Sequence, residues 1–227
     1  MIHPEHQRRA YLQAMGIDVW LPRDAVEPGD APLAAVGTAG AEELDWDELR
    51  QCVADCTRCE LSKSRRQTVF GTGNPSADWM IIGEAPGAEE DRRGEPFVGR
   101  AGTMLDEMLR AIGHSRDSVF IANTIKCRPP DNRDPKSAEA AACRDYLQRQ
   151  IALVQPKIIL AVGKIAAQNL LGCDDPVGAM RGKAHDHGGI PLVVTYHPAY
   201  LLRSPSQKRK AWSDLCLAAR LSVEGAA

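Results

Sequence analysis

Four short runs of apolar residues recur along the chain, and each ends at small or polar residues. Continuous apolar runs of this length are typical of strands that are buried on both faces of a parallel sheet, where no alternation with polar residues is needed. The sequence therefore predicts four buried parallel strands. They span residues 79–83, 119–123, 158–162 and 192–196.

Helical patterns lie between and after these runs. Apolar residues spaced three or four apart share one face within residues 105–112 and 146–154, and further helical patterns cover residues 164–171 and 207–221. Strands that alternate with helices in this way fold into right-handed crossover units. We therefore expect an α/β fold, a three-layer α/β/α sandwich around a four-stranded parallel sheet.

The patterned part of the chain follows an acidic N-terminal region. Residues 1–50 contain 4 Lys/Arg against 10 Asp/Glu, whereas residues 51–227 contain 24 against 20, so the body is mildly basic. Residues 23–45 are rich in Ala, Gly, Pro and acidic side chains, a composition that buries too little apolar surface to fold. We expect an N-terminal appendage, a flexible linker, one folded domain and a tail, at residues 1–22, 23–45, 46–222 and 223–227.

Several classes of protein are disfavoured by the sequence. No apolar run approaches the length of roughly 18 residues that a membrane-spanning helix needs, so we expect no membrane association. The first residues, MIHPEHQRRA, lack the apolar core of a secretory signal, which favours a cytoplasmic location. No G-x-G-x-x-G follows the first predicted strand and no Walker A sequence is present, so we expect no nucleotide cofactor.

Candidate functional segments follow three of the predicted strands. Ligands of open α/β sheets bind beyond the carboxyl ends of the strands, so these segments are expected to lie together. They are residues 83–91 (GEAPGAEED), 123–132 (NTIKCRPPDN) and 197–203 (HPAYLLR).

The seven cysteines favour a metal or cluster site over disulfides in a chain without an export signal. Cys56 and Cys59 form a C-x2-C pair, and Cys127 and Cys143 form a second, wider pair. Four thiolates from two such pairs can bind either zinc or an iron–sulfur cluster. Cys52, Cys56 and Cys59 also have the three-cysteine spacing of radical S-adenosylmethionine enzymes, although no strand precedes them here.

The three segments, the motif GEPFVGRAG at residues 94–102 and the paired cysteines together resemble the family 4 uracil-DNA glycosylases, which contain an iron–sulfur cluster. The resemblance runs in the same order from about Cys52 to Leu221. It implies a uracil-DNA glycosylase-like fold and a monofunctional hydrolase that removes uracil from DNA in base excision repair, leaving an abasic site. We expect uracil-containing DNA as its partner and a monomeric protein. The resemblance also implies a [4Fe–4S] cluster on Cys56, Cys59, Cys127 and Cys143.

Three residues are expected to handle the base, which must be flipped out of the duplex to be reached. Phe97 can stack on the flipped ring. The amide of Asn123 can donate to uracil O4 and accept from N3–H, a pattern that cytosine reverses. Breaking the N-glycosidic bond places negative charge on the departing uracil, which His197 can stabilise at O2.

Ala85 and Gly87 are also expected to contact uracil. They stand where the family 1 enzymes have an aspartate that activates water and a tyrosine that excludes thymine. Family 4 shares such small residues, so they support that subclass and leave the water-activating group open. Glu84 is the nearest carboxylate and our first candidate, with a backbone carbonyl as the alternative. Glu90 is expected to support the site by pairing with Asn132.

Residues 198–203 fit a loop that fills the space left by the flipped base. Leu201 is the predicted apolar wedge and Arg203 a predicted phosphate contact. Arg181 and Lys183 are further candidates for phosphate contacts.

Two other functions compete with this interpretation. One is a DNA-binding iron–sulfur protein with a degenerate glycosylase site, against which the intact set of Glu84, Phe97, Asn123 and His197 argues. The other is a radical S-adenosylmethionine enzyme, which would use Cys52 and would not need Cys127 or Cys143.

Overall fold

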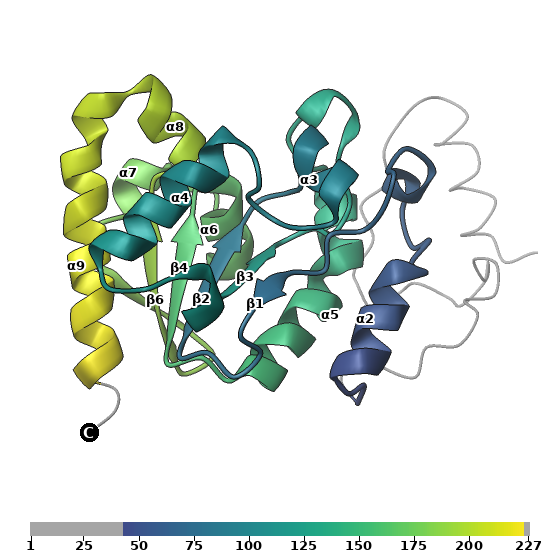
Figure 1. The fold of residues 1–227 in the computed structure, drawn as a ribbon, viewed down its shortest axis with the longest axis horizontal. Coiled ribbons are helices and arrows are strands. Elements are labelled where there is room, and N and C mark those ends of the chain that lie inside the picture. The colour runs from purple at the N-terminus through teal and green to yellow at the C-terminus, as the bar shows by residue number, and fades with distance from the viewer. Residues whose placement is uncertain (1–42, 225–227) are drawn as a thin grey trace, which may run out of the picture. The chain divides into compact units, whose positions relative to one another are not determined.

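The computed structural model describes residues 43–224. The predicted appendage at 1–22, the predicted linker up to residue 42 and residues 225–227 of the predicted tail lie outside this range. Within it, a six-stranded sheet is covered by helices on both faces (Figure 1). The α/β fold expected from the sequence is therefore confirmed.

The sheet contains the four predicted strands and two more at its edges. Four strands run parallel in the spatial order β3-β2-β4-β6: β2 (Trp79–Gly83), β3 (Phe120–Asn123), β4 (Ile158–Val162) and β6 (Ile190–Thr195). The edge strands β1 (Thr72–Gly73) and β5 (Ala184–His187) pair antiparallel with β3 and β6. The apolar pattern misses both, because β1 has two residues and neither strand contains a buried residue.

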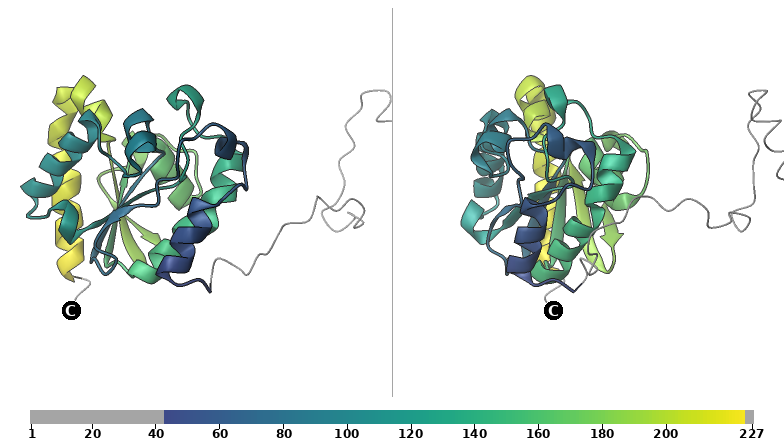
Figure 2. Two further views of the ribbon diagram at one scale, coloured as in Figure 1. Left: turned by 45° about the vertical axis from the view of Figure 1, so that its right-hand side comes forward. Right: turned by 90° about the vertical axis from the view of Figure 1, so that its right-hand side faces the viewer.

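The helices form two layers, one on each face of the sheet (Figure 2). The first layer consists of α2 (Trp46–Ala54), α5 (Ser137–Val154), α6 (Lys164–Leu171) and α7 (Val177–Met180). The second consists of α4 (Arg100–Ala111), α8 (Pro198–Arg203) and α9 (Lys208–Glu224). The short helix α3 (Ala88–Arg93) follows β2. Among residues 43–224, no helix has both the length and the apolar character to cross a lipid bilayer.

The central strand β2 shows why the sheet needs both layers. Met80 and Ile82 pack into the core beneath α2 and α5, whereas Trp79 and Ile81 pack into the separate core beneath α4 and α9. All four side chains are buried, which accounts for the continuous apolar run in the sequence.

The folded body includes the last residue of the predicted linker. Asp45 caps α2, because its side chain accepts hydrogen bonds from the backbone N–H groups of Asp47 and Glu48, and Glu48 in turn accepts from the backbone N–H of Asp45. This capping box satisfies N–H groups that have no partner within the helix.

The order of the parallel strands reverses between β2 and β4. The chain passes from β2 to β3 in one direction and from β4 to β6 in the other. In sheets of this kind a crevice opens at the carboxyl ends of the strands beside the reversal. Those ends are Gly83 and Val162, with Asn123 and Thr195 on their outer sides.

We expect Gly102→Ala to lower the midpoint of thermal unfolding, although alanine favours a helix interior over glycine by about 1 kcal/mol. A Cβ on Gly102 would overlap the backbone carbonyl oxygen of Phe97, so α4 would have to move. Gly178→Ala is the control, because a Cβ on Gly178 in α7 meets nothing within 4 Å. Equal unfolding midpoints for the two variants would contradict this account of α4 packing.

Candidate active site

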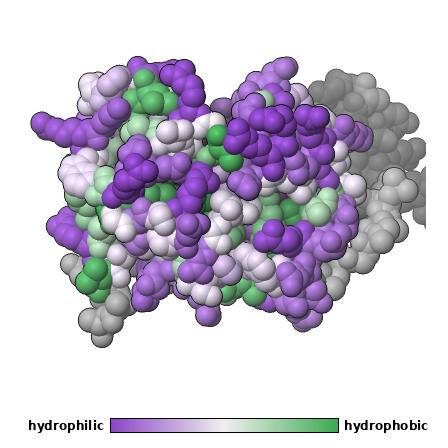
Figure 3. Space-filling model, viewed as in Figure 1, coloured by the Kyte–Doolittle hydropathy of each residue, from purple (hydrophilic) through white to green (hydrophobic). Residues whose placement is uncertain are grey.

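A cleft of about 730 Å³ opens beyond the carboxyl ends of the parallel strands. Figure 3 shows a notch in the upper edge of the molecule in this region, with hydrophilic residues on both sides. The three segments singled out in the sequence all contribute to it. The predicted site residues that line the cleft are Glu84, Ala85, Gly87, Glu90, Phe97, Asn123, Asn132, His197 and Arg203.

The end of β2 forms the floor of the cleft. A Cβ on Gly83 would lie 2.5 Å from Asn123 Oδ1 and 2.5 Å from Phe97 Cζ, so glycine is what allows these side chains to meet there. Glu84, the next residue, is partly buried in the cleft wall. Burial, with a smaller contribution from Asp134, raises the pKa of the Glu84 carboxyl to about 7. This carboxyl can therefore exchange a proton near neutral pH.

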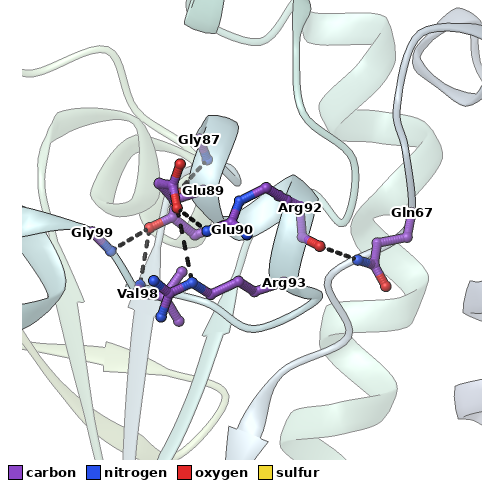
Figure 4. Close-up of polar contacts among 8 residues, drawn as sticks. All are labelled: Gln67, Gly87, Glu89, Glu90, Arg92, Arg93, Val98 and Gly99. Atoms are coloured by element: carbon purple, nitrogen blue, oxygen red, sulfur yellow. Dashed lines mark hydrogen bonds and ion pairs between the residues drawn. The ribbon is translucent and has the colours of Figure 1, made fainter.

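Glu90 connects two loops of the cleft. Its Oε2 accepts from the backbone N–H of Gly87 at 3.1 Å, and its Oε1 accepts from the N–H groups of residues 98–99 at 3.0 and 3.3 Å (Figure 4). The predicted pairing with Asn132 is wrong, because Glu90 bonds these backbone N–H groups and no hydrogen bond joins it to Asn132. Asn132 Oδ1 instead accepts from Arg128 Nε at 2.8 Å.

Phe97 is held in a backbone conformation that is unusual for its type. Its φ is 55°, in the left-handed region, which costs a non-glycine residue about 1–2 kcal/mol. Arg116 offsets this cost: its guanidinium donates to the carbonyl oxygens of Pro96 and Phe97 and pairs with Asp106 at 2.7 Å. The phenyl ring stacks beside the His197 imidazole, with ring centroids 5.7 Å apart.

The amide of Asn123 lies buried at the end of β3 with a hydrogen-bonding group left over. Asn123 is 2% exposed, and its Oδ1 has no hydrogen-bond partner among the described residues. The backbone is held on both sides, by pairing with Gly83 of β2 and by the Lys126 ammonium, which donates to the Asn123 carbonyl oxygen at 2.8 Å. An unpaired buried acceptor costs about 1–3 kcal/mol, so Oδ1 favours a ligand that brings an N–H group.

His197 begins α8 as its N-cap residue. Its Nδ1 accepts a hydrogen bond from the backbone N–H of Ala199 at 3.1 Å. Because a backbone N–H can only donate, Nδ1 carries a lone pair and the neutral ring carries its proton on Nε2. Burial and the positive charge of Arg203 lower the pKa of His197 to about 4, against a smaller opposing effect of Glu90. At neutral pH the ring is therefore an uncharged donor.

The prediction of Leu201 as the wedge is wrong. Residues 198–203 form a helix rather than a loop, and Leu201 points inward, 0% exposed, into the core that also contains residues of α4 and α9. The exposed large hydrophobic side chains of this helix are its neighbours Tyr200 and Leu202, which are 37% and 38% exposed. Arg203, the next residue, lines the cleft together with Tyr200.

The prediction of Arg181 as a phosphate contact is also wrong. Its guanidinium binds the buried carboxylate of Asp214 through two hydrogen bonds, at 2.7 and 3.0 Å, and donates to the Lys210 carbonyl oxygen at 2.6 Å. Lys183 is exposed but is not among the residues that line the cleft, so its contact with DNA stays a prediction.

The cleft contains further residues that were not expected. Gly163 and Lys164 follow β4, and the rule that selected the ends of the other three strands would have found them. Gly163 has a φ of 104° and passes close to His197, where a Cβ would lie 3.1 Å from the histidine Cβ. Tyr196 and Arg133 also line the cleft, each next in the chain to a predicted site residue.

The four predicted cluster ligands come from three segments of the fold. Cys56 and Cys59 follow α2, Cys127 follows β3, and Cys143 lies in α5. Burial raises the pKa of the Cys127 thiol to about 11 against a lowering effect of Arg65, and Cys143 and Cys59 make smaller contributions that also raise it. Burial likewise raises the pKa of Cys143, and Cys56 and Cys59 add to that shift. The four thiols are therefore close enough to interact.

Two basic residues act on the buried thiols. Arg65 Nη1 donates to Cys127 Sγ at 3.0 Å, and the backbone and charge of Lys126 lower the pKa of Cys143 against the effect of burial. Cys52 is exposed on α2, with its Sγ 3.7 Å from the Tyr146 hydroxyl. Within residues 43–224, no three His, Cys, Asp or Glu side chains converge as ligands of one metal ion.

Comparison with known proteins identifies the family. Residues 70–217 match the model of the uracil DNA glycosylase superfamily. Type-4 uracil-DNA glycosylases from Archaeoglobus fulgidus and Pyrobaculum aerophilum are 39% and 40% identical, over 74% and 77% of this chain and 88% and 93% of their own. The type-4 enzyme from Saccharolobus solfataricus is 44% identical over 76% of this chain and 82% of its own. The chain thus belongs to the uracil-DNA glycosylase superfamily, among the type-4 enzymes.

Proposed function

We propose that this protein is a uracil-DNA glycosylase, which hydrolyses the bond between uracil and deoxyribose in DNA and leaves an abasic site for base excision repair. The observation that carries the proposal is the unpaired Oδ1 of Asn123, buried in the cleft beside the Phe97 ring and the neutral imidazole of His197. One chain supplies all of these groups, which supports action as a monomer. A substrate of cellular DNA supports a cytoplasmic place of action, at the nucleoid.

Uracil meets the amide of Asn123 with complementary groups. Its N3–H donates to Oδ1, which otherwise has no partner, and its O4 accepts from the amide NH₂. Cytosine carries a lone pair at N3 and an amino group at position 4, so it would place acceptor against acceptor and donor against donor. Mismatched polar groups in a buried site reject an analogue more strongly than shape does. Phe97 supplies the stacking surface for the ring.

His197 acts on the charge that develops as the bond breaks. The departing uracil carries negative charge shared with O2, and the Nε2–H of a neutral imidazole can donate to that oxygen. A buried, preorganised donor of this kind is often worth about 10²–10³ in rate. The Ala199 N–H fixes the tautomer, so the ring need not reorganise during the reaction.

Glu84 is the group that we assign to water activation. A pKa of about 7 leaves much of the carboxyl ionised at neutral pH and makes it basic enough to orient and deprotonate water. Ala85 and Gly87, the small residues of the same loop, line the cleft with it and leave space for that water.

We assign the main DNA contacts to helix α8. Leu202 is the proposed apolar wedge, because it is exposed and next in the chain to Arg203, which lines the cleft. An apolar side chain inserted between base steps fills the space that a flipped nucleotide leaves. Arg203 and Lys164, both exposed in the cleft, are placed to contact phosphates.

We also propose that Cys56, Cys59, Cys127 and Cys143 bind a [4Fe–4S] cluster. The donor set has the right chemistry, because all four residues are thiols that interact with one another and Cys127 Sγ receives a hydrogen bond from Arg65. When bound, the cluster would cross-link the segment after α2 to β3 and α5. Because none of the four cysteines lines the cleft, we assign the cluster a structural role.

Asn123→Asp should lower uracil excision by two orders of magnitude or more. The change keeps the acceptor and replaces the NH₂ donor by a second acceptor, which then faces uracil O4 in a buried site. The measurement is single-turnover excision on matched oligomers that carry uracil or cytosine at one position. On the cytosine oligomer we expect at most weak excision by the variant. His197→Ala should slow uracil excision without creating a new substrate. Excision of uracil by Asn123→Asp at the parental rate would show that Asn123 does not read the base.

The rate of uracil excision should rise with pH and level off above about 7, because the Glu84 carboxyl acts in its ionised form. Below that pH the rate should fall up to tenfold per pH unit, while His197, with a pKa of about 4, stays neutral. Glu84→Gln should be slower and lose this dependence. Glu89→Gln, on the exposed face of α3, is the matched control and should keep the parental profile. A profile that is unchanged in Glu84→Gln would exclude Glu84 as the base.

Protein purified without exposure to oxygen should be brown and contain about four irons per chain. Cys143→Ser should lose iron, colour and soluble yield together, because the cluster joins distant segments of the fold. Cys173→Ser, at a partly buried cysteine outside the group of four, should keep all three. Stoichiometric zinc in place of iron would contradict the assignment.

A further inference from the structure

Lys126 is a buried charged residue that the proposed chemistry does not use. It is 1% exposed, and its ammonium donates to the backbone carbonyl oxygen of Asn123 at 2.8 Å and to Gln150 Oε1 at 2.6 Å. A methionine or leucine would fill the same space without the cost of burying an ammonium group, which is several kcal/mol for an unpaired ion. The two hydrogen bonds therefore indicate a specific use.

Gln150 links Lys126 to the helical layer. It is fully buried in α5, and its Nε2 donates to the backbone carbonyl oxygen of Phe70 at 2.9 Å. Its own side chain is thereby fixed at both ends. A continuous hydrogen-bonded path runs from Phe70 through Gln150 and Lys126 to the end of β3.

The end of β3 needs such support on its outer side. β2 pairs with Asn123 through Gly83, but the strand on the other side, β1, pairs only with Phe120 and Ile121. No strand therefore reaches Asn123 on that side, and the Lys126 ammonium bonds its carbonyl oxygen there.

The same residue lies beside the proposed cluster site. Cys127 is the next residue in the chain, and the backbone and charge of Lys126 lower the pKa of the Cys143 thiol against the effect of burial. The side chain of Lys126 and its backbone thus join two parts of the protein that otherwise have separate roles, the cysteine group and the residue that faces the base.

We propose that Lys126 is a positioning residue for base recognition: by holding the backbone carbonyl of Asn123, it fixes the direction of the amide that meets uracil. The inference rests on the proposed function, in which Asn123 reads the base. Lys126 itself does not line the cleft and touches no substrate. A reading group displaced by about 1 Å can cost a hundredfold in rate, so a buried anchor of this kind affects catalysis from behind the site.

The test is a double-mutant cycle on the iron-loaded protein. Lys126→Met should keep the parental iron content and lower single-turnover uracil excision by about tenfold to a hundredfold. Combined with Asn123→Ala, it should add little further loss, because residues that act through one another are not additive. When Lys126→Met is combined with His197→Ala, the loss of excision rate should equal the product of the two single losses. Lys126→Met should also weaken the binding of free uracil, as Asn123→Ala does.

Two results would overturn the inference. One is excision of uracil by Lys126→Met at the parental rate. The other is a double variant with Asn123→Ala whose loss of rate equals the product of the two single losses. If Lys126→Met loses iron or fails to fold, Gln150→Leu replaces it in the same cycle, because it removes the other partner of the ammonium and leaves Lys126 itself in place beside Cys127. Asn123→Ala measured alone separates the two proposals. If it excises uracil as fast as the parent, both the base contact and the role of Lys126 are excluded. If it is slow while Lys126→Met and Gln150→Leu are not, only the role of Lys126 is excluded.

Discussion

The amide of Asn123 lies at the end of β3 with a buried oxygen that accepts no hydrogen bond, and the rest of the site is arranged around it. In the absence of a base this oxygen costs about 1–3 kcal/mol, a cost that a mobile side chain would remove by turning to another partner. The surroundings pack closely against this side chain. Because Gly83 has no side chain, Asn123 Oδ1 and the Phe97 ring both lie close to its backbone. Lys126 holds the backbone carbonyl of Asn123 from behind.

Strain in the Phe97 loop belongs to the same arrangement. The left-handed backbone of Phe97 turns its carbonyl toward Arg116 and α4 and its ring toward His197. Glu90 collects three backbone N–H groups and so connects this loop to the one after β2. The unfavourable backbone conformation of Phe97 is therefore matched by hydrogen bonds from the charged Arg116 side chain, and Glu90 holds the adjoining residues, which favours one shape of the cleft before a base enters it.

The parallel core is predictable from sequence, because strands buried on both faces need continuous apolar runs, and β2 and β4 have the predicted bounds. The candidate residues at three strand ends meet in one cleft for the same topological reason. The loop predicted around Leu201 is a helix: Pro198 after a capping residue is a signal for a helix start, and the helix turns Leu201 inward. The pairing of Arg181 with Asp214 depends on tertiary structure alone, and no local pattern contains it.

The position of His197 at the start of α8 has a consequence for any attempt to measure its contribution. The ring that faces the cleft also accepts the first hydrogen bond of the helix that carries Leu202 and Arg203. Truncation to alanine therefore removes a helix cap, typically worth about 1 kcal/mol, together with the catalytic donor. Asparagine is among the best capping residues and lacks the imidazole. The difference between the alanine and asparagine variants would separate the folding contribution of this side chain from its electrostatic one.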